Sequence, residues 1–247
     1  MTVHFDGLTL DWLGYATLRI EGDDSVVYFD PGRYGVLTGE WEPHADVAHP
    51  PAQDYDAHDA DVVCVTHVHH YDPDGIRRVA NDDTTLVVFE GINVHRTDRD
   101  LDRPADLPYD RVEVSMEDDR LVDDLPLWTV PAYNDPDGPN VDETGEPIHP
   151  KGIGCGFLVA VDGTRVFWPG DTDVLPGHGE LDADVFVPSI AKNYTMDRHE
   201  AADLAEEMAP GLVLPMHYNT FEALESDSGA FATDVARRGV PVALDER

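Results

Sequence analysis

The sequence predicts an α/β protein in which helices cover mixed β-sheets, and three patterns support this class. Alternating apolar residues over 8–13, 16–20 and 25–29 are typical of a half-buried antiparallel meander. A strand–helix–strand rhythm over 61–89 favours a parallel pair of strands with a helical crossover. The second half of the chain again has strands followed by strand–helix units. We therefore expect one domain, residues 1–247, made of two similar halves.

The elements of the first half are bounded by turn residues. The meander ends at Asp30, where Pro and Gly follow, and residues 31–60 read as a long loop rich in Pro, Asp and His. We interpret the histidines of this loop as solvated residues rather than metal ligands: His44, His49 and His58. Apolar runs and their spacing then predict buried strands at 61–66 and 84–89, with a short helix at 74–80.

The second half begins with an acidic, weakly alternating stretch, residues 98–124, which indicates surface strands and turns. Asp162-Gly163 is a strong hairpin signal, and apolar residues on one face predict a helix over 197–208. The other elements follow from short apolar runs between turn residues: strands at 126–130, 156–161, 164–168, 185–187 and 211–215, and a last helix at 230–238.

The charge of the chain is unusually negative. Its 51 acidic and 16 basic residues give a formal net charge of −35, yet 41% of the residues are hydrophobic, so a folded domain with an acidic surface is expected. Such a charge destabilises the compact state unless salt screens it. We interpret the composition as that of a halophile with concentrated salt in its cytoplasm; the alternative is an ordinary acidic protein.

The same composition argues against several partners. No basic stripe is present for nucleic acid or an anionic membrane, and no run approaches 18 apolar residues. The N-terminus lacks the charged and apolar regions of a signal peptide, so a cytoplasmic protein is expected. Its cysteines, Cys64 and Cys155, lie in apolar runs and are predicted to be buried, reduced thiols.

Metal-type residues occur at the ends of several apolar runs. His67 and His69 follow the strand at 61–66, and in an extended segment this spacing places both imidazoles on one side. The later residues of the set lie at turns or after strands: His149, Asp171 and His217. Imidazole and carboxylate are the usual protein ligands of zinc and related divalent ions, so the series predicts a metal site at the rim of a sheet.

Motifs spread over nearly the entire chain extend this series. They are Trp12-Leu13-Gly14-Tyr15-Ala16, Asp30-Pro31, Thr66-His67-Val68-His69, Phe167-Trp168-Pro169-Gly170-Asp171-Thr172-Asp173, Tyr194-Thr195-Met196-Asp197 and Pro215-Met216-His217-Tyr218-Asn219-Thr220-Phe221. Together they resemble the metallo-β-lactamase-fold hydrolases, in particular the ascorbate-6-phosphate-lactonase-like branch. The resemblance implies a four-layer αββα sandwich, with two mixed sheets face to face, helices outside and the metal site at one rim.

The resemblance also implies roles for the metal-type residues. His67, His69 and His149 would hold a first metal ion, Asp171 would bridge to a second, and His217 would bind the second. We assign Asp171 in addition to orienting the nucleophile. The neighbouring acids Asp30 and Asp173 are expected to fix histidine tautomers, although for Asp30 a plain turn role is the alternative.

The chain departs from the family pattern after His69. The expected Asp-His pair falls on Tyr71-Asp72 without a gap, or on Asp72-Pro73 with one inserted residue, so one second-metal ligand is lost. We assign Asp72 as the compensating ligand or proton shuttle, with His70 as the alternative. The first metal ion is therefore the firmer expectation.

Two further departures concern aromatic and amide residues. The early Gly-His of the family is Gly14-Tyr15 here. The third histidine often follows the strand that ends near Tyr133, where this chain offers Asn134; His149 is the substitute that we choose.

The predicted function is that of a metal-dependent hydrolase, in which a metal-bound hydroxide attacks a small ester, a lactone or a phosphorylated metabolite. The expected cofactor is one or two Zn²⁺ ions, with Mn²⁺ or Fe²⁺ as alternatives. A metal-dependent nuclease or phosphodiesterase and a binding protein with a degenerate site are the competing functions. Oligomeric state stays open.

The rare lysines suggest how a substrate is held. The chain has only Lys151 and Lys192, and each lies in one of the motif regions, after His149 and before Tyr194 respectively. A purely structural lysine is easily replaced by arginine, so we assign Lys151, Lys192 and Tyr194 to substrate binding, with Lys151 the stronger candidate for contact with an anionic group.

Overall fold

The computed structural model describes residues 2–32, 55–97 and 99–246, in which two mixed sheets are built in the same way. The first sheet has seven strands in chain order, and β1 to β4 pair antiparallel whereas β4 to β7 pair parallel. Its strands are β1 (Val3–Phe5), β2 (Leu8–Gly14), β3 (Thr17–Glu21), β4 (Val26–Phe29), β5 (Ala60–Val65), β6 (Ala80–Phe89) and β7 (Asp110–Val114).

The second sheet repeats this plan with six strands in the order β13-β12-β11-β10-β9-β8. Strands β8 to β11 pair antiparallel with their neighbours, whereas β11 to β13 pair parallel. The strands are β8 (Asp119–Val122), β9 (Leu125–Pro131), β10 (Cys155–Val161), β11 (Thr164–Trp168), β12 (Val185–Phe186) and β13 (Leu212–Val213). In both sheets the parallel strands are joined by crossovers, which is why each half has its own helices.

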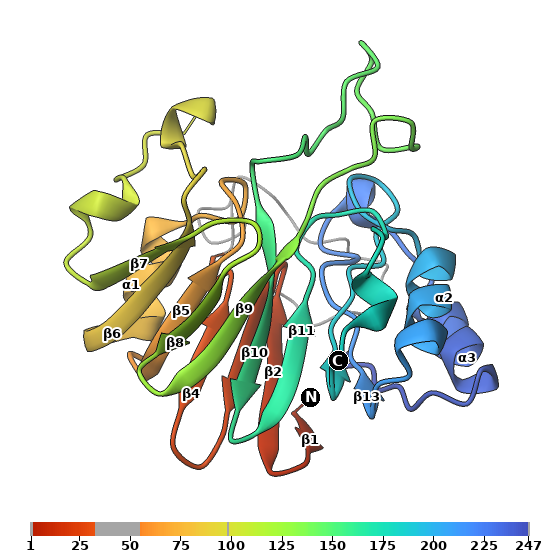
Figure 1. The fold of residues 1–247 in the computed structure, drawn as a ribbon, viewed down its shortest axis with the longest axis horizontal. Coiled ribbons are helices and arrows are strands. Elements are labelled where there is room, and N and C mark those ends of the chain that lie inside the picture. The colour runs from red at the N-terminus through yellow and green to blue at the C-terminus, as the bar shows by residue number, and fades with distance from the viewer. Residues whose placement is uncertain (1, 33–54, 98, 247) are drawn as a thin grey trace.

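Helices cover the outer faces of the two sheets (Figure 1). Residues of α1 (Pro73–Val79) pack with Tyr28 and Val63 in a cluster on the outer face of the first sheet. A larger cluster joins inner residues of both sheets, such as Trp12 and Phe157, with α2 (Arg198–Met208) and α3 (Ser228–Arg237). The layers are thus helix, sheet, sheet and helix, and the predicted four-layer αββα sandwich is confirmed.

The helices begin where the sequence supplies capping carboxylates. Asp72 accepts hydrogen bonds from the first backbone N–H groups of α1, where proline occupies the first turn. Asp197 and Glu200 form a reciprocal capping box at the start of α2, and Asp227 caps α3. Short 3₁₀ turns complete the helical elements: η1 (Val94–Arg96), η2 (Pro104–Asp106), η3 (His178–Glu180) and η4 (Glu222–Leu224).

Most elements predicted from the sequence lie where they were expected, and the differences have simple causes. The three-residue strand β1 was missed because it is too short to show a period of two. The acidic stretch 98–124 contains the edge strands β7 and β8, whose outward residues face solvent. Cys64 and Cys155 are buried free thiols, as predicted. No helix in the described ranges is both long and apolar enough to cross a membrane.

Candidate metal centre

The metal-type residues are brought together at one end of the two sheets. His67 lies two residues beyond the end of β5, and Asp171 lies three residues beyond the end of β11. His217 follows β13, and His149 lies on the long connection between β9 and β10. His67 also forms an isolated bridge with Gly154, where an added Cβ would lie only 2.9 Å from the His67 Cβ. Because Gly154 has no side chain, the segment before β10 of the second sheet can approach the loop that carries His67 after β5 of the first sheet.

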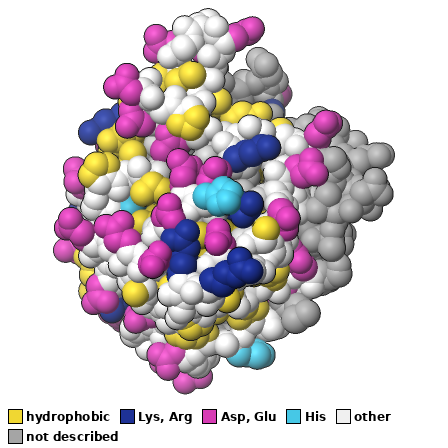
Figure 2. Space-filling model, turned by 90° about the vertical axis from the view of Figure 1, so that its right-hand side faces the viewer, with side chains coloured by type: hydrophobic (Ala, Val, Ile, Leu, Met, Phe, Trp, Pro, Cys, Tyr) yellow, Lys and Arg dark blue, Asp and Glu magenta, His cyan; other side chains and the backbone are white. Residues whose placement is uncertain are grey.

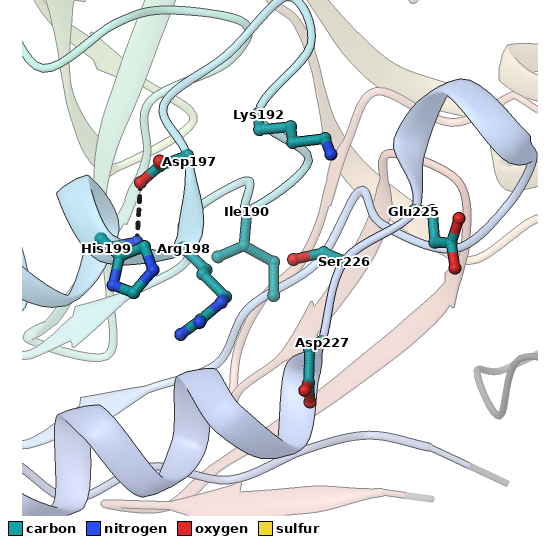
Figure 3. Close-up of a pocket in the computed structure, with 8 residues that line it drawn as sticks. All are labelled: Ile190, Lys192, Asp197, Arg198, His199, Glu225, Ser226 and Asp227. Carbon is teal, nitrogen blue, oxygen red and sulfur yellow. Dashed lines mark hydrogen bonds between the residues drawn. The ribbon is translucent and has the colours of Figure 1, made fainter.

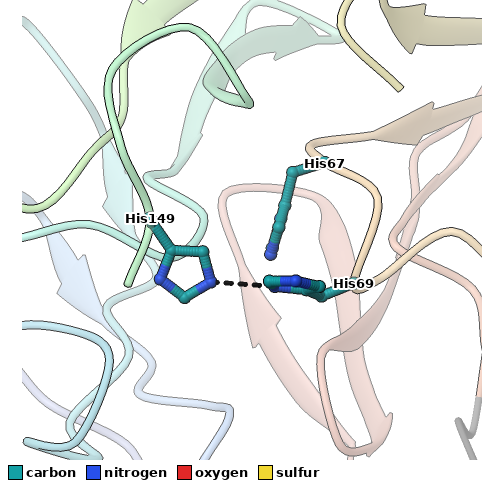
Figure 4. A group of neighbouring side chains, drawn as sticks. All are labelled: His67, His69 and His149. Atoms are coloured by element: carbon teal, nitrogen blue, oxygen red, sulfur yellow. Dashed lines mark hydrogen bonds between the residues drawn. The ribbon is translucent and has the colours of Figure 1, made fainter. Parts of the chain in front are cut away.

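Three histidines form a first group. Ring nitrogens of His67, His69 and His149 lie within 4.8 Å of one another, and the His69 Nδ1 to His149 Nε2 distance is 3.0 Å (Figure 4). His67 and His149 are buried, and His69 is half-buried. Three converging imidazoles are a frequent donor set for zinc, with a further position left for solvent or substrate.

A second group lies on the other side of Asp171. The Nε2 atoms of His70 and His217 are 2.9 Å apart, and each lies 3.5 Å from Asp171 Oδ1. The other oxygen of the same carboxylate, Oδ2, lies 3.7 Å from His67 Nε2 and 3.6 Å from His149 Nε2. One carboxylate therefore faces both groups of histidines, each with a different oxygen.

Asp30 positions His70 of the second group. Its buried carboxylate accepts hydrogen bonds from the Thr66 backbone and hydroxyl, at 2.8 Å each, and from Trp168 Nε1 at 2.7 Å. His70 Nδ1 lies 2.8 Å from the same carboxylate. A carboxylate on one ring nitrogen leaves the other, Nε2, to act as a donor toward a metal ion. The expected tautomer role of Asp30 fits this geometry.

His149 is held by a second set of contacts. Asn134 Oδ1 accepts the His149 backbone N–H at 2.8 Å and lies 3.2 Å from His149 Nδ1. The Asn134 amide donates in turn to Asp173 at 3.0 Å. Asp173 thus supports a ligand histidine through Asn134 rather than by direct contact. Asn134, at the position where the family pattern has its third histidine, thus contacts and orients His149, the residue that we chose as the substitute.

Burial keeps most of these imidazoles in the neutral form that binds metals. Desolvation is the largest cause of the low pKa values of His67 and His217, and it lowers the pKa of His69 to about 4 and of His149 to about 3. For His70, burial lowers the pKa, but Asp171 and Asp30 outweigh it and the net pKa is raised. Burial also raises the pKa of Asp171 to about 6. A cation between the groups would favour the ionised form of Asp171 and the neutral form of the imidazoles.

The residues present fit a metal ion. Within the described part of the chain, the buried atoms His67 Nε2 and Asp171 Oδ1 have no hydrogen-bond partner. Unsatisfied buried polar atoms are costly, and two of them among converging nitrogen and oxygen donors suit a bound cation. Four residues of the site are among those with left-handed backbone conformations, which also occur at turns elsewhere in the described chain: Tyr15 (φ 49°), Asp30 (φ 45°), Tyr194 (φ 82°) and His217 (φ 58°).

The assignment of Asp72 as a ligand disagrees with this geometry. Its carboxylate Oδ1 accepts the backbone N–H groups of Asp74 at 3.0 Å and Gly75 at 3.4 Å, so it is used to start α1. The chain enters the helix immediately after Asp72, and this turns the carboxylate toward the helix amides. His70, the alternative, lies beside Asp171 and His217 instead.

The lysines do not line the centre. Lys151 is exposed, and its Nζ lies 5.3 Å from the centre of the Tyr133 ring. Lys192 lines a different hollow of about 700 Å³, between the first turn of α2 and residues 225–227 (Figure 3). The face that carries α2 and α3 shows Lys, Arg and His side chains among acidic ones (Figure 2). The predicted contact of a lysine with substrate at the metal centre therefore has no geometric support.

Three other histidines of the described residues lie apart from the centre. His58 is exposed, and its Nδ1 lies 2.9 Å from the carbonyl of Ala80. His178 is buried at a turn near the Pro131 carbonyl, and His199 is exposed on α2. His44 and His49 lie outside the described residues.

A cavity of about 240 Å³ opens beside the two groups of histidines. Tyr194 lines it, as its assignment to substrate binding requires. Sequence reasoning missed Phe221, Leu224 and Arg99, which also line the cavity, and left Tyr15 without a role. Gly14-Tyr15 was visible as a departure from the family motif; nothing in the local pattern around Arg99 distinguishes it from a surface arginine.

The fold and the donor set together define a metallo-β-lactamase-type protein, and comparison with known sequences agrees. The family model of the Beta-lactamase superfamily domain matches residues 9–217, and the chain belongs to that family. Within it, the chain belongs to the UPF0173 metal-dependent hydrolases. A relative of that name from Archaeoglobus fulgidus is 30% identical over 239 residues, which cover 95% of this chain and 94% of the relative.

Solved structures show the same fold. A crystal structure described as a putative metal-dependent hydrolase from Parabacteroides distasonis has a TM-score of 0.70 and 22% identity, with coverage of 99% of this chain and 97% of that one. A metallo hydrolase from Ignicoccus hospitalis has a TM-score of 0.69 and 21% identity, with coverage of 96% and 94%. The family match and the relative from Archaeoglobus fulgidus show that the protein is a metal-dependent hydrolase of the metallo-β-lactamase superfamily.

Proposed function

We propose that this protein is a zinc hydrolase with two metal positions that acts on a small ester, lactone or phosphorylated metabolite. His67, His69 and His149 would hold the first ion, and His70 and His217 the second, with Asp171 between them. The position of the Asp171 carboxylate carries this proposal: Oδ2 faces the first histidine group at 3.6–3.7 Å, and Oδ1 faces the second at 3.5 Å.

The donor set favours zinc over harder cations. Five imidazoles and a single carboxylate suit Zn²⁺, with Fe²⁺ and Mn²⁺ as poorer fits, because the harder ions prefer oxygen ligands. When bound, such an ion supplies Lewis acidity and lowers the pKa of its water to about 7. The chain itself orients His70 through Asp30 and His149 through Asn134. The apolar side of the cavity, with Phe221 and Leu224, would exclude water from a bound substrate.

The first prediction is that protein purified without chelator contains one to two equivalents of zinc. It should hydrolyse at least one class in a panel of lactones, carboxylic esters and phosphate esters, and dialysis against EDTA should abolish that activity until zinc is restored. Elemental analysis measures the zinc content, and a pH-stat assay measures the hydrolysis.

The matched control is His199→Ala, which removes an exposed histidine that is not part of the centre and should leave metal content unchanged. Protein that neither binds zinc nor hydrolyses any member would contradict the proposal.

The second prediction concerns the charge of −35, for which we propose adaptation to concentrated salt. Raising KCl from about 0.1 M to about 3 M should screen the repulsion between carboxylates. The unfolding temperature is then expected to rise by about 5–15 °C, equivalent to a few kcal/mol for a chain of this size. Thermal unfolding followed by circular dichroism checks it. KCl stabilises proteins only weakly except by screening their charges. An unfolding temperature that stays constant or falls as KCl is added would therefore rule out the adaptation.

A further inference from the structure

His217 is held differently from its neighbours in the centre. A histidine that binds metal through one ring nitrogen is usually oriented by a hydrogen bond on the other. Three histidines here have an oxygen atom close to Nδ1: His67 (Thr66 hydroxyl, 2.9 Å), His70 (Asp30, 2.8 Å) and His149 (Asn134, 3.2 Å). The Nδ1 of His217 is buried and has no hydrogen-bond partner among the described residues. The orientation of this imidazole therefore depends on packing.

The ring of Tyr15 packs on the second group of histidines. Its centroid lies 4.7 Å from that of His217, with the ring planes inclined by 47°. It also meets His70 edge-on, at 5.3 Å and 82°. Trp168 stacks on His217 from a greater distance, 6.4 Å. Tyr15 and His217 are both buried, so the phenol ring limits the rotation of the imidazole.

Tyr15 is itself fixed by the residues around it. It lies in the tight connection between β2 and β3, with a left-handed φ of 49°. Its carbonyl accepts a hydrogen bond from Trp12 Nε1 at 2.8 Å, and the Trp12 backbone N–H donates to Asp245 at 2.9 Å. The Trp12 ring packs on Tyr218, at 4.7 Å, and Tyr218 directly follows His217. The contacts thus form a closed circuit that joins the end of β2 to the segment after β13.

We propose that Tyr15 is the positioning residue of His217 and that it sets the affinity of the second metal position for its ion. This inference rests on the proposed function, since it concerns the ion that His70 and His217 would hold. Packed aromatic rings contribute free energy beyond that of their buried area. A ligand that is already oriented binds its ion without a further loss of side-chain freedom. Tyr15 stands where the family pattern has a histidine, so the packing is a feature of this chain.

The test is a titration of the metal-free protein with Co²⁺, followed by visible absorption, which reports each binding step without an activity assay. Tyr15→Leu should weaken the second step by about 10-fold, the low end of the loss expected when a partner that orients a ligand is removed. The first step should be unchanged, because His67 and His149 keep their oxygen partners. Tyr15→Phe keeps the ring and should retain both steps.

A second variant guards against a failure of Tyr15→Leu to fold. Asparagine adopts the left-handed conformation of this turn more readily than leucine does, so Tyr15→Asn should preserve the turn while it removes the ring. The same loss of about 10-fold is expected for the second step. The control variant is Tyr109→Leu, which removes a half-buried tyrosine packed on the outer face of the first sheet. Both of its binding steps should match those of the parent.

The outcomes separate this inference from the proposed function. An unchanged second step in Tyr15→Asn, an equal weakening of both steps, or a loss in Tyr15→Phe as large as in Tyr15→Leu would overturn the role of the ring. In each of these cases the unmodified protein still binds two ions, and the proposed function stands. An unmodified protein that binds fewer than two Co²⁺ ions would overturn the two metal positions and the inference with them.

Discussion

Replacing Asp171 by Asn should lower kcat/KM for any hydrolysed substrate by about 10²–10³-fold, the loss of several kcal/mol of charge stabilisation. The amide has no negative charge and only one oxygen, whereas both carboxylate oxygens face histidine groups in the structure. Zinc content should fall toward one equivalent, since the first group of three histidines is unaltered. Steady-state kinetics and elemental analysis on the same preparation check both results.

The fold of the Asp171→Asn variant should be unharmed. Burial raises the pKa of Asp171 from 3.8 to about 6, so without metal its ionised form costs free energy at neutral pH, above both values, and this cost disappears as the pH falls. The metal-free variant should therefore unfold at the same temperature as the metal-free parent or at a higher one. A lower temperature would assign Asp171 a structural role instead.

Asp72→Ala is the matched control for Asp171→Asn. It removes the capping contacts of α1 and should cost about 1 kcal/mol of unfolding free energy. Zinc content and kcat/KM should stay close to those of the parent, because His70 and not Asp72 lies beside Asp171. A large loss of zinc from this variant would restore Asp72 to the ligand set.

Replacing Asp30 by Ala should have the largest effect on stability. The carboxylate is buried and accepts from Thr66 and Trp168 while contacting His70, so its removal leaves several buried polar groups without a partner. We expect the free energy of unfolding to fall by about 3–5 kcal/mol. Urea denaturation of the metal-free protein measures it without a contribution from zinc.

The control for Asp30→Ala is Asp61→Ala, which removes an exposed carboxylate of β5 that accepts one hydrogen bond, from Val26. It should cost about 1 kcal/mol or less. A similar cost for both variants would mean that the buried hydrogen bonds of Asp30 contribute little. In folded Asp30→Ala protein, zinc affinity should also fall by about 10–100-fold, because His70 loses the partner that orients it.

The elements of the fold could be predicted because local pattern and tertiary structure agree. Strand β2 alternates between buried and half-buried residues because one of its faces lies against the core, and β5 is apolar and buried from Val62 to Val65 because both faces are covered there. A strand as short as β1, with three residues, does not show the two-residue alternation that identifies a strand in the sequence. The expectation of two mixed sheets face to face came from the resemblance to a known fold, and the order of the strands within each sheet was not predicted.

The candidate site was predictable only where a local pattern, such as the end of a strand, fixes the position of a residue. His67, His69 and His217 follow strands, so their place at the rim is readable, and His149 and Asp171 agree with the motif order. The choice between Asp72 and His70 as the further ligand was not decided by spacing. This choice depends on which residue begins α1, and thus on the direction in which the chain leaves the loop that carries His67 and His69.

Residue types and their periods were enough to predict the class of fold and the series of metal-type residues, because each is a property of neighbouring residues or of motif order. The direction of each side chain is a property of the packed structure. Folding decided that the Asp171 carboxylate faces two histidine groups, that Asp30 contacts His70, and that Arg99 reaches the cavity. These contacts join segments distant in sequence, and no local pattern encodes the geometry in which two sheets meet.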